Sequence, residues 1–304
     1  MPANHATRPL ELNGLKGRIL QLPSQAQSQD SILLVYGVHS SLERMFSTAE
    51  FLSRYGAVTL PDLPGLGGMD SFYKIGLLPN LDNYADYLFD LLKQLKLKPP
   101  IKVVAMSFGF LVVTRMLQRH PEVRRQFSHV ISFVGFGRFS DFKNNLTQRL
   151  VFWPLCALLS TRPGGWLIKR GLFNPVGLKL MFGLFRTFNP KYKHGLATDP
   201  TGSLKMELDL WQKNDARTRF YLYRLLFSFD LTDSAEPIKL PLHNMTTPTD
   251  QYFDAKRVAN SLGRLFKPVS QSSANMSLHA PSIIGTTEEV AGIFSDEAKA
   301  ILKN

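Results

Sequence analysis

Residues Ile101–Phe110 of this 304-residue chain read IKVVAMSFGF and place a serine between a strand-like segment and a helix-like segment. The β-branched, mostly apolar residues before Ser107 predict a strand, and the apolar spacing after it, as far as Leu117, predicts a helix. So sharp a corner requires small residues two positions before and two positions after the serine, and these are Ala105 and Gly109. The pattern is typical of a nucleophile elbow, which presents its serine at a strained turn. A serine in this place can also be a simple helix N-cap, and these residues alone leave both interpretations open.

Strand-like and helix-like segments alternate on both sides of this corner. The strand-like segments are short apolar runs of the kind that is buried on both faces of a parallel sheet. Their alternation with helices predicts crossover connections, so we expect an α/β fold in which helices flank a mostly parallel sheet. Ser40 and Glu43 form a capping-box pattern before the first expected helix, and Thr286 precedes the last one. The expected strands are 32–36, 57–60, 101–106, 129–134 and 240–245.

The alternation stops between residues 138 and 237, where the sequence is aromatic and helix-like without a good strand. We interpret 138–237 as a helical insertion that divides the α/β core into residues 1–137 and 238–304. Residues 1–11 are expected to form a loose tail, and residues 12–22 to contain an opening strand or two.

The composition narrows the class of protein. Hydrophobic residues make up 44% of the chain, which is enough for a globular core. The single cysteine, Cys156, excludes an internal disulfide and a paired-cysteine metal site. The first residues lack the apolar core of a signal peptide, and no segment approaches the roughly 20 apolar residues of a membrane span, so we expect a cytoplasmic protein. The formal net charge of +12 points to an anionic partner or surface.

Five motifs agree in order and spacing with one known family. They are Tyr36-Gly37-Val38, Asp62-Leu63-Pro64-Gly65, Ala105-Met106-Ser107-Phe108-Gly109, the segment 241–250 and His279-Ala280-Pro281. Together they resemble the α/β-hydrolase superfamily from residue 32 onward. The resemblance implies a hydrolase without metal or organic cofactor, in which residues 138–237 form a cap. Asp62 is expected to fix the loop beside the site.

The resemblance implies a catalytic triad of Ser107, Asp250 and His279. A serine hydroxyl needs a base within hydrogen-bond reach, and histidine titrates near neutral pH. The superfamily order is serine, acid, histidine, and among the seven histidines this order leaves His279. Asp250 stands where the acid is expected, at the end of a strand and loop. Asp254, which also suits a helix N-cap, and Asp141 remain as alternative acids.

The same resemblance implies an oxyanion hole made by the backbone N–H groups of Val38 and Phe108. The function that follows is hydrolysis of a carboxylic ester through an acyl-enzyme. The sequence departs from the superfamily pattern at Tyr36, Ala105 and Leu278, where relatives often have histidine, glycine and glycine. These departures leave a catalytically silent binding module as an alternative, and carbon–carbon bond hydrolysis by the same triad is another.

Basic residues and large apolar residues are mixed within the insertion. Residues 142–198 contain nine lysines and arginines and no aspartate or glutamate, interleaved with phenylalanine, tryptophan and leucine. The mixture is typical of an element that lies peripherally on an anionic membrane surface, and also of a lid with an apolar inner face and a solvated basic outer face. Both interpretations favour a hydrophobic ester as substrate. No nucleic-acid-binding motif accompanies the charge, so nucleic acid is not an expected partner.

Overall fold

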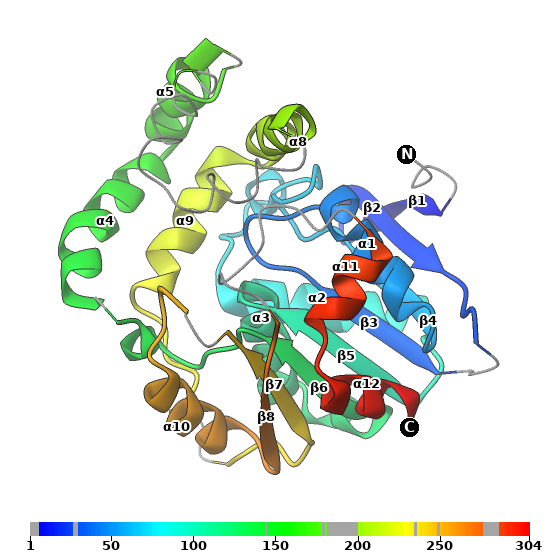
Figure 1. Ribbon diagram of the computed structural model, residues 1–304. Coiled ribbons are helices and arrows are strands. Elements are labelled where there is room, and N and C mark those ends of the chain that lie inside the picture. The colour runs from blue at the N-terminus through cyan, green and yellow to red at the C-terminus, as the bar shows by residue number, and fades with distance from the viewer. Residues whose placement is uncertain are drawn as a thin grey trace.

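A twisted sheet runs through the centre of the molecule, with helices on both of its faces (Figure 1). This computed structural model describes residues 6–26, 30–143, 145–174, 176–177, 180, 200–233, 236–247, 250–275 and 286–304. Over these residues the sheet has eight strands in the order β1-β2-β4-β3-β5-β6-β7-β8. The strands are β1 (Thr7–Leu12), β2 (Leu15–Leu22), β3 (Ser31–Val35), β4 (Ala57–Pro61), β5 (Ile101–Met106), β6 (Phe127–Phe133), β7 (Leu242–Thr246) and β8 (Val269–Ser273).

Parallel pairing joins β4, β3, β5, β6, β7 and β8, so the prediction of a mostly parallel sheet is confirmed. Among the strands described, the antiparallel pairings are those of β1 with β2 and of β2 with β4. The expectation of a loose tail over residues 1–11 is wrong for residues 7–11, which belong to β1. Asn13 and Gly14, with φ of 52° and 80°, make the two-residue turn into β2, and both left-handed residues suit a tight hairpin.

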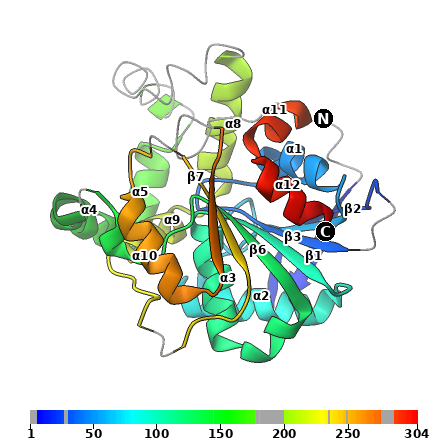
Figure 2. The ribbon, with the colours of Figure 1, turned by 60° about the horizontal axis from the view of Figure 1, so that its bottom comes forward.

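The core helices divide between the two faces of the sheet. Figure 2 shows α2 and α3 together on one face and α1, α11 and α12 on the other. The core helices are α1 (Leu42–Leu52), α2 (Leu81–Leu95), α3 (Phe108–Arg119), α10 (Ala255–Leu265), α11 (Thr287–Ile293) and α12 (Asp296–Lys303), with 3-10 turns at Phe72–Ile75, Pro121–Gln126 and Phe139–Asp141.

Two helix boundaries differ in detail from the sequence predictions. Helix α1 is capped by Ser41, whose hydroxyl accepts a hydrogen bond from the N–H of Arg44, and not by Ser40. The expected last helix is two helices, α11 and α12. The first of them begins at the expected Thr286, which forms a capping box with Glu289.

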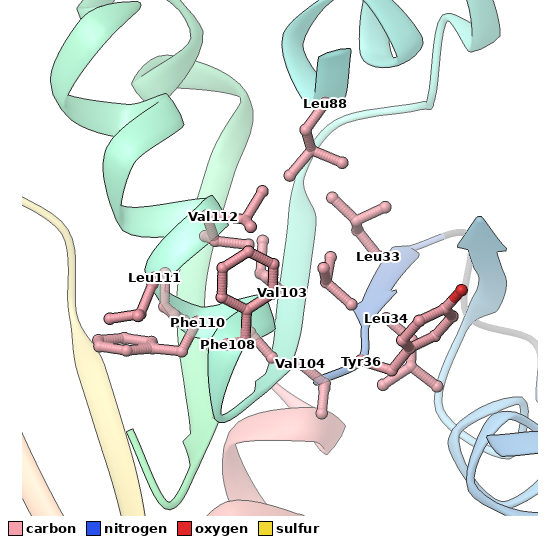
Figure 3. Close-up of a cluster of buried hydrophobic side chains, with 14 of the residues drawn as sticks. Leu33, Leu34, Tyr36, Leu88, Val103, Val104, Phe108, Phe110, Leu111 and Val112 are labelled. Atoms are coloured by element: carbon pink, nitrogen blue, oxygen red, sulfur yellow. The ribbon is translucent and has the colours of Figure 1, made fainter. Parts of the chain in front are cut away.

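The most deeply buried part of the core surrounds β5 and the start of α3. Figure 3 shows Leu33 of β3, Val103 of β5 and Leu88 of α2 on the side of Phe108 and Val112 of α3, while Phe110 and Leu111 project from the other side of the helix. Burying one such side chain stabilises the fold by about 1.5–3 kcal/mol. The corner between β5 and α3 is therefore held by dense packing on every side.

Among the described residues, four α-helices lie between β6 and β7 in the chain, and we call them the insertion helices. They are α4 (Asn145–Leu159), α5 (Arg162–Gly171), α8 (Pro200–Lys213) and α9 (Ala216–Leu226). Helices α4 and α5 pack against α9 and against each other, at the edge of the molecule in Figure 1. A small cluster of Phe173 and Ala216 with Trp211 and Phe220 joins the segment after α5 to α8 and α9.

Candidate active site

Ser107 occupies the corner between β5 and α3 with a left-handed backbone, φ 49° and ψ −115°. Its N–H donates to the carbonyl oxygen of Phe133 at the end of β6, at 3.0 Å. The hydroxyl makes no capping hydrogen bond to α3, so the simple N-cap interpretation does not describe this serine. Positive φ in a residue with a side chain costs on the order of 1–3 kcal/mol, and such strain concentrates at functional sites. The corner is a strained elbow that carries a serine.

Small residues allow the loop after β3 to approach this elbow. A Cβ atom on Gly109 would lie 2.4 Å from the carbonyl oxygen of Val35 and 2.6 Å from that of Tyr36. A Cβ atom on Gly37 would lie 3.4 Å from both the Met106 oxygen and the Ser107 Cβ. The backbone that continues from Gly37 therefore passes directly beside the serine.

One predicted oxyanion donor, Phe108, belongs to the corner at Ser107, and the other, Val38, belongs to the loop after β3 that passes beside this corner. Phe108 is the first residue of α3, and an N–H group in the first turn of a helix has no partner within the helix. Val38 follows Gly37 in the loop after β3, and both Val38 and Phe108 are buried. The positive end of the α3 dipole also lies here, which favours negative charge at this point.

A buried polar network holds the loop after β3. The hydroxyl of Tyr36 donates to Asp62 Oδ1 at 2.9 Å and accepts from the N–H of Leu63 at 3.0 Å. Arg18 Nε donates to the other oxygen of Asp62 at 3.0 Å. Burial raises the pKa of Asp62 to about 7, although Arg18 and Tyr36 both favour its charged form. Asp62 thus ties the D-x-P-G turn to Tyr36, the residue that stands where relatives often have histidine.

Asp250 lies beyond the end of β7, at the same edge of the sheet as Ser107, with β6 between the two strands. It lines a small pocket together with Val134 and Gly135 after β6 and with Thr246 and Thr247 at the end of β7. Its Oδ1 atom accepts hydrogen bonds from the N–H groups of Tyr252 and Phe253, at 2.8 and 3.1 Å. This turn fixes the direction of the carboxylate, and the part of Asp250 in the triad stays a prediction.

The two alternative acids have structural partners. Asp254 caps α10 by accepting from the N–H of Arg257 at 3.0 Å, the role that its position predicted. Asp141 is fully buried and accepts from the hydroxyl of Ser261 and from the N–H groups of Gly137 and Arg138. Burial raises the pKa of Asp141, while these hydrogen bonds oppose the shift.

The histidines divide in a similar way. His243 lies within β7, between the hydroxyls of Ser270 and Ser272 at 2.8 Å each, and burial lowers its pKa. It is part of the sheet packing. His279 falls in 276–285, outside the described residues, so its part in the triad stays a prediction.

Two features of this edge were not predicted from the sequence. Val134, directly after β6, has φ 46°, which is an outlier for a β-branched residue, and its N–H donates to the Met245 oxygen at 2.8 Å. The junction between α8 and α9 is bonded to the turn after Asp62. Asn214 Oδ1 accepts from the Gly67 N–H at 2.7 Å, and the Asp215 N–H donates to the Gly65 oxygen at 2.9 Å. The glycines of that turn were the available signal, because a Cβ on Gly65 would collide with Thr218 of α9.

Within the described residues, no group of three or more His, Cys, Asp or Glu side chains is arranged to hold a metal ion. No described helix is both long and apolar enough to cross a membrane.

No protein-family model matches the chain, and no curated protein sequence matches it. Solved structures do match it over nearly its whole length. The enol-lactonase from Burkholderia xenovorans LB400 has 16% identity and a TM-score of 0.63, with 97% of each chain covered. An esterase from Rhodococcus sp. ECU1013 has 14% identity and a TM-score of 0.63, with 98% of each chain covered. The N-formylmaleamic acid deformylase from Pseudomonas putida S16 has 16% identity and a TM-score of 0.64, covering 95% of this chain and 100% of that one. At such identities the likeness concerns the fold alone.

Proposed function

The chain has the α/β-hydrolase fold, and from this premise we propose that it is a serine hydrolase that cleaves a carboxylic ester with a hydrophobic acyl group. The observation that carries the proposal is the strained backbone of Ser107 at the corner between β5 and α3. A residue in this conformation persists only where its surroundings enforce it, and the tight contacts of Gly109 and Gly37 do so here.

In the proposed reaction the Ser107 hydroxyl attacks the ester carbonyl carbon while His279 accepts its proton. Asp250 orients the imidazole and stabilises its protonated form. The N–H groups of Phe108 and Val38 receive the developing oxyanion. His279 then protonates the departing alcohol, and water attacks the acyl-enzyme in a second step that regenerates Ser107.

The preference for a hydrophobic acyl group is supported by the insertion helices. Trp211 of α8 packs against His39, with ring centroids 5.5 Å apart, and His39 directly follows Val38. Trp211 also packs against Phe173 at 4.4 Å. Aromatic surface of the insertion therefore lies beside the loop that carries a proposed oxyanion donor, and a cap over residues 138–237 would extend this apolar wall.

The test is hydrolysis of p-nitrophenyl esters from acetyl to palmitoyl by the wild type and by Ser107→Ala. We expect activity that rises with acyl length and falls by roughly a thousandfold or more in the variant. Ser128→Ala is the matched control, because Ser128 lies near the opposite end of β6 and its buried hydroxyl has no hydrogen-bond partner among the described residues.

The other outcomes separate the alternatives. Ser107-dependent activity that is greatest on acetyl esters would contradict the hydrophobic substrate and leave the serine hydrolase. Absence of Ser107-dependent turnover on every ester would contradict ester hydrolysis. Labelling of Ser107 by a serine-reactive phosphonate would then distinguish a carbon–carbon bond hydrolase, which reacts, from a silent binding module, which does not.

A further inference from the structure

Large apolar side chains are exposed along α4 and α5 and just beyond. Their exposed fractions run from 39% for Trp153 to 67% for Leu150, and such side chains are uncommon elsewhere among the described residues. We call this set the α4–α5 surface. Its members are Leu146, Leu150, Val151, Phe152, Trp153, Leu155, Leu158, Trp166, Leu167 and Leu172.

Helix α4 is apolar around most of its circumference, although only one side of it packs on α9. A helix of this composition is normally buried on all sides. Here Cys156 is buried, while Leu155 and Leu158 on other sides of the helix are exposed. Figure 1 shows α4 and α5 at the margin of the molecule, with α9 between α4 and the sheet. Phe152 and Trp153 lie on the side toward α9, near Phe227 and Arg224. An exposed apolar area such as the remaining side chains of the set form marks a surface that a partner covers.

The charged side chains of α4 and α5 themselves have a single sign. Between residues 145 and 171 the chain carries Arg149, Arg162, Lys169 and Arg170, all exposed, and no aspartate or glutamate. The guanidinium of Arg170 lies 5.5 Å from the ring centroid of Trp166. Tryptophan beside basic side chains is the combination that binds the boundary between lipid headgroups and acyl chains.

We propose that the α4–α5 surface docks on an anionic lipid bilayer, with both helices lying in the plane of the headgroups. Leucines and tryptophans enter the upper acyl region, and the four basic residues contact anionic headgroups. The helices have 15 and 10 residues and do not span the bilayer. A second copy of the chain fits less well, because a twofold contact would bring the same basic residues face to face. The proposal does not depend on ester hydrolysis.

The test is co-sedimentation with vesicles of phosphatidylcholine alone and of phosphatidylcholine mixed with phosphatidylglycerol. We expect the wild type to bind the mixed vesicles at low salt and to dissociate from them at high salt. Its affinity for vesicles of phosphatidylcholine alone should be at least tenfold lower. The double variant Leu150→Glu/Leu158→Glu and the variant Arg149→Glu should each lose at least tenfold in affinity. All three side chains are exposed, so their replacement leaves the core intact.

Two controls match these changes outside the α4–α5 surface. Leu78→Glu replaces an exposed leucine before α2, and Arg8→Glu replaces an exposed arginine of β1, and both should bind as the wild type does. Failure of the wild type to sediment at low salt would overturn the proposal, and so would equal binding by the α4–α5 variants. A dimer in analytical ultracentrifugation that Leu150→Glu/Leu158→Glu dissociates, without vesicle binding, would assign the surface to a second copy instead.

Discussion

Ser107 and Val134 both have left-handed backbones at the carboxyl ends of neighbouring strands. Each is pinned to the next strand, Ser107 through the oxygen of Phe133 and Val134 through the oxygen of Met245. Strain at one residue is common at a functional corner. Here a second strained residue follows the neighbouring strand, and it is a β-branched valine, which tolerates positive φ poorly. This edge of the sheet is therefore held out of its relaxed conformation by its packing.

Gly109 gives a residue-scale prediction. In Gly109→Ala the added Cβ would lie 2.4 Å from a backbone oxygen, so either β3 or α3 must move, and we expect a loss of at least about 2 kcal/mol in the free energy of unfolding. Gly263→Ala is the matched control, because nothing lies within 4 Å of a Cβ atom built at this position, which is in the last turn of α10. That variant should gain roughly 0.5–1 kcal/mol. Urea unfolding measures both, and equal stabilities would contradict the tight contact.

At this scale the sequence predicted the sharp corner at Ser107 and the need for a small residue at Gly109, because a strand, a serine and a helix in immediate succession have few other arrangements. It did not predict Val134. Positive φ there results from pairing with β7, more than 100 residues away in the chain, and leaves no mark on the local pattern. Asp254 and Asp141 had the residue type of a catalytic acid, and the sequence pattern did not show the helix cap and the buried hydrogen bonds in which the structure places them.

Adjacent serines before α1 give a prediction at the scale of one element. Ser41 accepts a hydrogen bond from the Arg44 N–H, so Ser41→Ala should lower the free energy of unfolding by roughly 1 kcal/mol. The hydroxyl of Ser40 is buried and has no hydrogen-bond partner within the part of the chain that the structure describes. Ser40→Ala should therefore be neutral or slightly stabilising. Thermal unfolding of the two variants decides between Ser41 and Ser40 as the cap; the reverse order of stabilities would restore the capping box expected from sequence.

The elements themselves were largely predictable, since strands and helices of the core repeat a clear alternation. The exception at the amino-terminal side, β1, is polar on one face and has no apolar run. Its signal was the pair Asn13-Gly14, which favours a tight hairpin and identifies the strands on either side of it. The turn residues indicate β1, and the apolar pattern alone does not.

On the scale of the whole molecule, Glu43 connects three distant parts of the chain. Its carboxylate pairs with Arg18 of β2 at 2.7 Å and with Lys213 of α8 at 3.1 Å. Burial acts to raise the pKa of Glu43, but the Arg18 hydrogen bond and charge and the helix backbone outweigh it and lower the pKa to about 2. The folded state therefore binds fewer protons here than the unfolded chain between about pH 2 and 4.5.

This difference makes stability depend on pH. The contribution of Glu43 is complete above about pH 4.5 and is lost as the pH falls toward 2. We expect Glu43→Gln to flatten the acid side of the stability profile by on the order of 2 kcal/mol, measured by urea unfolding at a series of pH values. Glu11→Gln removes a carboxylate that is largely exposed and should keep the wild-type profile. A Glu43→Gln profile that still falls as steeply would show that the pairing contributes nothing.

The fold class could be predicted because it depends on local patterns repeated in order. The joints between the insertion helices and the core could not, because they pair residues such as Glu43 and Lys213 that are 170 positions apart. Charged and polar side chains of this kind look like ordinary surface residues in a sequence. Their partners become evident only when the chain is folded.

The insertion helices are attached to the core unequally, and this determines where the gene can be recombined. Residues 214–218 are bonded to the turn at 65–71, whereas α4 and α5 contact chiefly α9 and each other. A chimera that exchanges residues 145–171 with a homologue leaves those joints unchanged. A chimera that exchanges 200–226 separates bonded partners unless 65–71 is exchanged with it. In a recombination library, residues 65–71 and 214–218 should therefore come from the same parent sequence.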